Sequence, residues 1–360
     1  MMCILNVLSR FMRFFGFGFV DYDLEPKINK KLRIGILSTA KISKQSLINP
    51  SKFNRNIEIV AIASRKSGSK YVSYDELLMD PKIDAIYIPL PNGLHYKWAL
   101  KALENNKHVL LEKPFVSNYD SAERLINASK RCGKIVLEAM HSIYHPSIKF
   151  VKELIDNGHI ENIISINATF HSRIYKDDIR FNKNGSDKLL SGGSLMDNGV
   201  YCIYVILYIL GLDFDKVVYA KAKTCFDVVD SQMDAIISFK GSDIRAVISS
   251  SFNAIYPADF VPKLVIKGSE DSIIFYNFVL PSLWHSIKID SRKYGSRQET
   301  RYGPSQETSY EYQLEYFYNA VVNLNDFYNV DFYNELSLKV LKIIDEIYIK
   351  SGIGPRIGYD

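Results

Sequence analysis

The chain has 360 residues, of which 47% are apolar and 24% charged, so it is long enough for two domains and can bury a sizeable core. This composition excludes a disordered chain, a collagen-like repeat and a disulfide-stapled miniprotein. The net charge is only +5, from 45 basic and 40 acidic residues, and no run of five basic residues occurs. Nucleic-acid binding is therefore not expected, whereas an anionic small molecule remains a candidate ligand.

The four cysteines lie far apart and form no C-x-x-C pair, so we expect neither a metal site nor a disulfide framework. Reduced thiols favour a cytoplasmic protein, and no uncharged apolar stretch reaches the roughly 18 residues that a membrane span needs. Residues 1–30 are rich in apolar and aromatic side chains and carry Arg10 and Arg13. We expect a loosely packed N-terminal extension, with an organelle-targeting or membrane-surface helix as the alternative.

The elements predicted from residue 31 onward alternate between strands and helices. Short apolar runs predict strands, and the segments of helical periodicity between them predict helices. The strands are expected at 32–37, 57–63, 85–89, 108–111 and 135–138, and helices near 98–103 and 121–130. Alternating strands and helices form parallel β-α-β units with right-handed crossovers, so we expect a doubly wound Rossmann domain over residues 31–145.

The pattern changes after residue 146, where residues of alternating polarity predict an open, mainly antiparallel sheet. Its strands are expected at 163–170, 217–224, 234–239, 244–252, 263–267 and 272–275. Helices are expected at 147–156, 310–323 and 334–350, and an apolar, hence buried, helix at 197–210. The polar stretch 292–309 is predicted to be a surface loop. Residues 146–360 are thus expected to form an α+β substrate and dimerisation domain.

Ligands of a parallel sheet bind beyond the carboxyl ends of its strands, and the segment after the first strand lies there. It reads Ser38-Thr39-Ala40-Lys41-Ile42-Ser43. Small residues stand at the first, third and sixth of these positions, where a dinucleotide-binding loop has its glycines. The segment is therefore a candidate cofactor loop, although an ordinary tight turn between strand and helix would have a similar sequence.

Two further segments follow strand ends. Ser64 and Arg65 follow the second strand, where an NAD-binding protein has an acid that bonds the 2′-hydroxyl of the ribose. No acid stands here, and an arginine suits the 2′-phosphate of NADP. We expect NADP, with NAD as the alternative, while a solvated basic turn is the simplest interpretation.

Glu112-Lys113-Pro114 ends the fourth strand. A lysine there can hold a substrate hydroxyl and lower the pKa of a neighbouring acid, although most lysines simply lie at the surface.

A glycine-rich turn at 191–193 leads into the buried helix that carries Asp197 and Tyr201. Residues four apart project from the same face of a helix. A buried carboxylate and phenol need polar partners, which a functional site would supply. The alternative for Tyr201 is a core tyrosine bonded to the backbone, since the chain has 24 tyrosines.

In this order, the segments resemble the Gfo/Idh/MocA oxidoreductase family, and most closely its branch of NADP-dependent D-xylose 1-dehydrogenase and trans-1,2-dihydrobenzene-1,2-diol dehydrogenase. The resemblance runs from about residue 31 to 356 and is carried by 33–42, 87–95, 112–114, 192–201, 312–320 and 352–355. It implies a Rossmann domain followed by an α+β domain with an open sheet. In this branch it also implies frequent homodimers that pair through that sheet.

The resemblance implies NADP-dependent hydride transfer between a sugar or diol carbon and the nicotinamide C4. It places the catalytic lysine at Lys113, the family aspartate at Asp197 and the catalytic tyrosine at Tyr201. Tyr201 would be the general acid/base, assisted by the other two. The loop beside the nicotinamide would be formed by Pro91, Asn92 and His95, and Glu112 would belong to the cofactor site with Lys113.

Two segments depart from the family pattern. Only five residues separate Arg65 from Tyr71, where the family has a helix. Ile143 stands where the branch carries an arginine near the substrate, and an apolar side chain cannot bond a hydroxyl. The substrate is therefore open among pentoses, hexoses, dihydrodiols and dicarbonyl compounds. The alternative function is a catalytically degenerate family member that senses a ligand or acts as a scaffold, and a sugar-binding protein without cofactor is a third.

Overall fold

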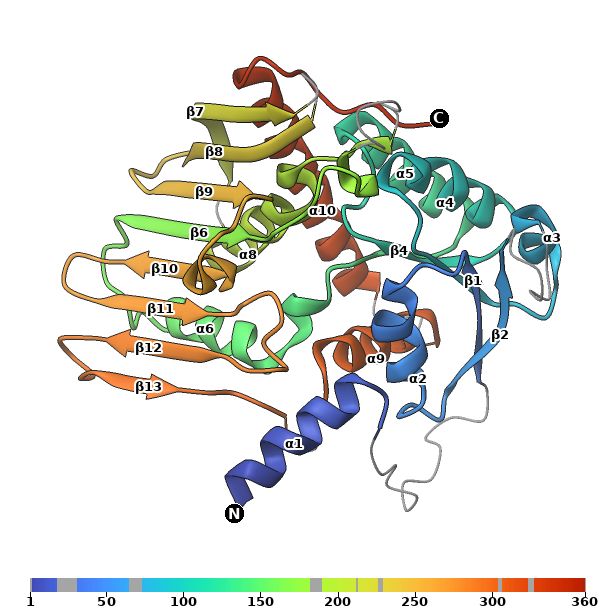
Figure 1. The fold of residues 1–360 in the computed structure, drawn as a ribbon, viewed down its shortest axis with the longest axis horizontal. Coiled ribbons are helices and arrows are strands. Elements are labelled where there is room, and N and C mark those ends of the chain that lie inside the picture. The colour runs from blue at the N-terminus through green and yellow to red at the C-terminus, as the bar shows by residue number, and fades with distance from the viewer. Residues whose placement is uncertain are drawn as a thin grey trace.

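The computed structural model describes residues 2–17, 31–64, 73–181, 190–211, 213–225, 229–303, 306–322 and 327–359. Within these residues the strands form two sheets, one of five strands from the first half of the chain and one of eight from the second half. Figure 1 shows the two sheets on opposite sides of the molecule, with the long helix α10 (Phe327–Lys350) between them. The predicted fold class is confirmed.

The five-stranded sheet is parallel throughout, in the order β2-β1-β3-β4-β5. Each strand lies within one residue of its predicted ends, because apolar runs covered on both faces are the sequence signature of a buried parallel strand. The strands are β1 (Leu32–Leu37), β2 (Ile57–Ala63), β3 (Ala85–Ile88), β4 (His108–Glu112) and β5 (Val136–Ala139).

Helices α4 (His95–Glu104) and α5 (Tyr119–Cys132) connect these strands. The sequence defines both ends of α5: the Asn118 side chain accepts a hydrogen bond from Ser121 N, and Gly133 adopts a left-handed conformation with φ 61°. A short helix, α3 (Tyr74–Met79), precedes β3 and was not predicted. The helix that the family places directly after β2 would fall on residues 65–72, which lie outside the described residues.

The eight-stranded sheet has the order β13-β12-β11-β10-β6-β9-β8-β7, and its pairs are antiparallel except β6 with β9. Two strands were missed, and one of them lies inside the polar stretch 292–309, so the prediction of a surface loop there was wrong in part. The strands are β6 (Ser165–His171), β7 (Phe214–Cys225), β8 (Val229–Phe239), β9 (Arg245–Ser251), β10 (Lys263–Lys267), β11 (Ser272–Tyr276), β12 (Ser286–Asp290) and β13 (Arg297–Glu299).

Helix α8 (Val200–Leu210) forms the centre of the second half. Every residue from Val200 to Ile209 is buried, as its all-apolar sequence predicted, and it packs against β6, α6 (Pro146–Asp156) and α10. A five-residue π-helical turn, η6 (Leu195–Gly199), leads into α8. Helix α9 (Ser309–Val322) packs against two turns that follow parallel strands, η3 (His141–Tyr144) after β5 and η1 (Lys44–Ile48) after β1.

Part of the expected N-terminal extension is an ordered helix, α1 (Met2–Phe14), rather than a loosely packed segment. It is held by two arginines that face the protein: Arg10 donates to Gln306 Oε1 and Arg13 to Glu311 Oε1, both at 2.7 Å. Residues 18–30 lie outside the described residues. In the part of the chain that the structure describes, no helix is both long and apolar enough to cross a membrane.

Candidate active site

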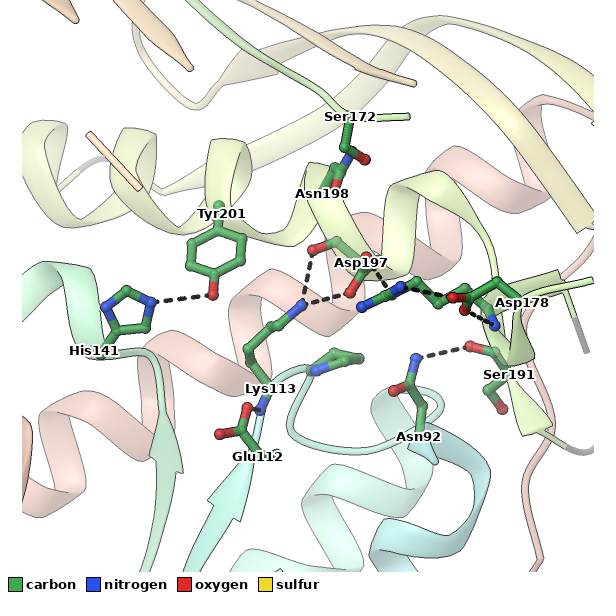
Figure 2. Close-up of polar contacts among 12 residues, drawn as sticks. Asn92, Glu112, Lys113, His141, Ser172, Asp178, Ser191, Asp197, Asn198 and Tyr201 are labelled. Carbon is green, nitrogen blue, oxygen red and sulfur yellow. Dashed lines mark hydrogen bonds and ion pairs between the residues drawn. The ribbon is translucent and has the colours of Figure 1, made fainter. Parts of the chain in front are cut away.

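Figure 2 shows the three predicted catalytic side chains facing one another, with Lys113 at the end of β4 and the other two on η6 and α8. Lys113 Nζ donates to Asp197 Oδ1 at 2.6 Å and to the Asp197 carbonyl oxygen at 3.0 Å. The same Nζ lies 5.1 Å from the centroid of the Tyr201 ring. The structure therefore brings an ammonium, a carboxylate and a phenol from the two halves of the chain to one place.

Glu112 fixes the backbone from which Lys113 projects. Its Oε1 accepts a hydrogen bond from the Tyr87 hydroxyl at 2.5 Å, and its Oε2 accepts one from Lys113 N at 3.2 Å. The side chain is buried, and burial raises its pKa. Glu112, which the sequence suggested as part of the cofactor site, is thus turned into the protein and holds the end of β4.

A buried carboxylate fixes the start of η6. Asp230 is fully buried and accepts hydrogen bonds from Ser194 Oγ at 2.9 Å, Leu195 N at 2.7 Å and Arg356 Nη2 at 2.7 Å. Gly193 precedes these residues with φ 133°, and a Cβ there would lie 2.0 Å from Asp230 Oδ1. Only glycine fits this close approach. The glycine at 193 therefore allows the backbone before η6 to contact the Asp230 carboxylate.

Asp197 is held between two cations. Lys113 bonds its Oδ1, and Arg180 Nε lies 3.0 Å from its Oδ2, while Arg180 Nη1 also pairs with Asp178. The side chain is 21% exposed, so it remains accessible. Burial opposes its ionisation, but the charges of Lys113 and Arg180 together lower the pKa of Asp197 below its ordinary value. Asp197 is therefore ionised at neutral pH and can accept a hydrogen bond.

The Tyr201 hydroxyl meets a histidine that the sequence analysis did not single out. Tyr201 is 7% exposed, and its oxygen lies 3.3 Å from His141 Nε2. The other ring nitrogen of His141 lies 2.8 Å from Ser309 Oγ, and the Tyr310 ring packs on the imidazole with centroids 4.0 Å apart. Burial raises the pKa of Tyr201 well above its ordinary value. An unaided tyrosine here would stay protonated.

His141 and Arg180 were missed for different reasons. His141 stands two residues before Ile143, in a segment that drew attention only for its missing arginine. Ile143 is 1% exposed and packs in the core, so it presents no surface to a ligand. Arg180 lies in a short 3-10 turn, η4 (Ile179–Phe181), in a polar stretch without periodicity. Only the fold brings it to Asp197.

The loop after β1, the predicted cofactor loop, begins with a left-handed residue. Ser38 has φ 87°, a left-handed conformation that favours glycine, and its Oγ accepts a hydrogen bond from Ala40 N at 3.2 Å. The Thr39 and Lys41 side chains are exposed and that of Ile42 is half-buried. Ser64 is buried at the end of β2, and Arg65 lies outside the described residues.

The loop after β3, which was predicted to lie beside the nicotinamide, is held by hydrogen bonds to other loops. Asn92 Nδ2 donates to Ser191 O at 3.0 Å and so ties the loop after β3 to the turn that precedes η6 (Figure 2). His95 is fully buried, with its ring nitrogens 2.8 Å from Leu90 O and 2.9 Å from Pro114 O. His95 therefore sets the relative positions of this loop and the Lys113 loop and does not itself reach the Lys113, Asp197 and Tyr201 cluster.

A parallel Rossmann sheet with a lysine directly after its strand β4 faces a carboxylate on η6 and a tyrosine on α8. This is the arrangement of a nicotinamide-dependent oxidoreductase. Residues 32–140 match the family model described as "Oxidoreductase family, NAD-binding Rossmann fold", and residues 148–274 match the "GFO/IDH/MocA C-terminal domain". The chain belongs to the Gfo/Idh/MocA oxidoreductase family. The predicted family and enzyme class, together with the nicotinamide cofactor, are confirmed.

Several relatives and solved structures are similar to the chain. It is 33% identical over 236 residues to a D-xylose 1-dehydrogenase (NADP(+)) of Haloferax volcanii, covering 62% of this chain and 70% of the relative. It is 30% identical over 236 residues to a trans-1,2-dihydrobenzene-1,2-diol dehydrogenase of Xenopus tropicalis, with the same coverage. A 3-ketoreductase of Actinomadura kijaniata, solved with NADP and TDP-benzene, shares the fold with a TM-score of 0.76, 24% identity and coverage of 92% and 100%.

Proposed function

We propose that the chain is an NADP-dependent dehydrogenase that transfers hydride between a sugar or diol carbon and the nicotinamide ring, with Tyr201 as general acid/base. One observation carries the proposal: the Lys113 ammonium is bonded to Asp197 at 2.6 Å and lies 5.1 Å from the centroid of the Tyr201 ring. This is the set of groups needed to bind a hydroxyl and move its proton. The names of the D-xylose and diol dehydrogenases quoted above support the substrate class.

The residues after β1 fit a dinucleotide. The left-handed Ser38 begins a turn of small residues that leads into a helix, where backbone N–H groups can meet a pyrophosphate. Ser38, Thr39, Ala40, Lys41 and Ile42 would hold that part of the cofactor. The 2′-phosphate of NADP would lie by Ser64, since no acid follows β2. When bound, the nicotinamide supplies a C4 that accepts or returns hydride.

The proton is moved by this chain's own residues. In the oxidation direction, Tyr201 would accept the proton of the substrate hydroxyl as its carbon loses hydride, and in the reverse direction it would return that proton to the carbonyl oxygen. A tyrosine titrates near pH 10 and burial raises that value, so its ionised form needs stabilisation. The Lys113 ammonium supplies positive charge beside the ring, and the ionised Asp197 accepts a hydrogen bond from the substrate and orients it.

The open face of the eight-stranded sheet supports a homodimer. One row of residues crosses five neighbouring strands in register and is only half-buried, although most of its members are apolar: Ile236, Val247, Asn167, Val265 and Ile274. Such a surface is typical of a sheet that is covered by a partner. We propose that two copies pair through this face. Sedimentation of Val265→Lys should then show a monomer, and a dimer that survives the change would contradict the proposal.

The enzyme proposal is tested by cofactor binding and turnover measured together. Fluorescence titration with NADPH and NADH should show tighter binding of NADPH. A panel of pentoses, hexoses and trans-dihydrodiols is then screened with NADP⁺. Tyr201→Phe and Lys113→Ala should each lose turnover by about a hundredfold or more, and Tyr201→Phe should keep NADPH binding. The matched control is Tyr204→Phe, a buried tyrosine on the same helix that should keep activity.

Three outcomes would contradict the proposal. Full turnover by Tyr201→Phe would end its assignment as acid/base. Tight NADPH binding by wild type without turnover on any member of the panel would instead favour the ligand-sensing or scaffold alternative. Absence of binding by either nucleotide would favour a sugar-binding protein without cofactor.

A further inference from the structure

A buried chain of three side chains ends on the Tyr201 oxygen, and the proton transfer described above leaves its first two members without a role. Figure 2 shows His141 beside Tyr201, with His141 Nε2 3.3 Å from the phenol oxygen. His141 Nδ1 lies 2.8 Å from Ser309 Oγ. His141 and Ser309 are 2% and 1% exposed, so solvent does not compete for these contacts. Both ring nitrogens are thereby committed.

The surroundings of His141 keep its imidazole neutral. Burial, and then the positive charge of Lys113, lower the pKa of His141 to about 3. A neutral imidazole carries one N–H, and its partner at Nδ1 decides which nitrogen holds it. The Ser309 hydroxyl can donate to Nδ1, because a serine hydroxyl is both donor and acceptor. With Ser309 as the donor, the N–H would reside on Nε2 and point at the Tyr201 oxygen.

We propose that His141 is a positioning residue whose Nε2–H donates to the Tyr201 oxygen and so directs the phenol O–H toward the substrate. This inference rests on the proposed function, in which Tyr201 exchanges a proton with the substrate oxygen. In oxidation the substrate proton moves to a Tyr201 oxygen held by the N–H. In reduction Tyr201 gives up its proton and the N–H holds the oxygen that remains. His141 itself neither gains nor loses a proton.

The charges around Tyr201 show why a second donor is needed. Burial raises the pKa of Tyr201 most, and its acidic neighbours, the Tyr310 phenol and three carboxyl groups, raise it further. Lys113 is the cation among the groups that face it, and it is already bonded to Asp197. A neutral N–H adds stabilisation of the phenolate without a further buried charge. The titratable groups that face Tyr201 are Lys113, Glu112, Glu138, His141, Asp197 and Tyr310.

The ring of Tyr310 keeps the imidazole in place. It packs on His141 with centroids 4.0 Å apart, and it belongs to α9, which also carries Ser309 at its first position. Ser309 N donates to Ser282 Oγ at 2.6 Å, which fixes the backbone of this turn. The orientation of His141 therefore depends on the first turn of α9.

The first test is the pH dependence of NADP⁺-linked oxidation of whichever panel substrate turns over, beginning with D-xylose. His141→Phe keeps the aromatic contact but removes the N–H that stabilises the charged Tyr201 oxygen. Because a hydrogen bond to a charged group is stronger than one between neutral groups, the change should lower kcat/KM about 10- to 100-fold. The acidic limb of the profile should move to higher pH by about one to two units. His141→Gln, whose amide N–H can replace Nε2–H, should restore most of both. A packing role alone would lower kcat/KM and leave the limb in place.

The second test needs no turnover. NMR of isotope-labelled histidine, assigned by the loss of one signal in His141→Gln, reports the tautomer directly among the seven histidines. We expect neutral His141 with the proton on Nε2 near neutral pH, and a loss of that preference in Ser309→Ala. His285→Phe, a change at another buried histidine, should alter neither the tautomer nor the limb.

Each result bears on one proposal. A proton on Nδ1, an imidazolium near neutral pH or an unmoved limb in His141→Phe would overturn the role of His141. If Tyr201→Phe keeps full turnover, the acid/base assignment fails instead. Should His141→Phe not fold, Ser309→Ala and His141→Gln decide the matter through the tautomer and the limb.

Discussion

Removal of the Arg356 guanidinium should destabilise the protein far more than removal of an exposed one. Arg356 Nη2 pairs with Asp230 Oδ1 at 2.7 Å, and the two side chains are 7% and 0% exposed. Arg356→Met keeps much of the volume but leaves a buried carboxylate without its cation. The loss of one partner of a buried ion pair costs about 3–5 kcal/mol, so the free energy of unfolding should fall by that amount.

The assay is urea unfolding, with Arg292→Met as the matched control. Arg292 pairs with Glu270, but their side chains are 77% and 53% exposed, so this change should cost less than about 1 kcal/mol. In the double variant Arg356→Met with Asp230→Asn the stranded charge is gone, and the loss should be smaller than the sum of the two single losses. A cost below about 1 kcal/mol for Arg356→Met would refute the claim that Asp230 depends on this partner.

Two further predictions concern buried groups near the site. Burial raises the pKa of Glu138 from 4.5 to about 7, so the stability that its neutral form provides is complete below about pH 4.5 and is lost as the pH rises through 7. Glu138→Gln should therefore match wild type in urea unfolding at low pH and exceed it by about 3 kcal/mol above pH 7, and a constant difference across this range would contradict the reasoning. Gly193→Ala should lower the thermal midpoint and the activity, because its Cβ would lie 2.0 Å from Asp230 Oδ1, with a cost of about 2 kcal/mol or more. Gly133→Ala is the control for a positive φ in open space, and an equal effect of the two changes would show that the contact with Asp230 is unimportant.

The parallel sheet could be predicted from the sequence because its strands are mostly apolar runs, and four of the five are largely buried. The edge strand β2 is the exception, since Glu58 is exposed, yet its apolar residues still indicated a strand. Strand β12 was missed because only two apolar residues, Ile287 and Ile289, alternate with polar ones there. Strand β13 has no apolar residue, and it forms only by pairing with β12. A strand such as β13 forms through its hydrogen bonds to a neighbouring strand, so its own sequence contains no pattern that predicts it.

The positions of Lys113, Asp197 and Tyr201 could be predicted because each stands at a strand end or helix start with a recognisable local sequence. Their partners could not. His141 and Ser309 are 168 residues apart, and Asp230 and Arg356 are 126 apart. Nothing in the local sequence of any of these four distinguishes it, since their contacts depend on how α9, α10 and the two sheets pack.

The last described residues restrict how the two halves of the molecule can move. Tyr359 N donates to Gly93 O at 2.7 Å in the first half, and Ser191 Oγ donates to Ile357 O at 2.5 Å in the second. A hinge motion that moved the two halves apart would have to break these two hydrogen bonds of the C-terminal segment. Ligand exchange is therefore expected to proceed by local loop displacement.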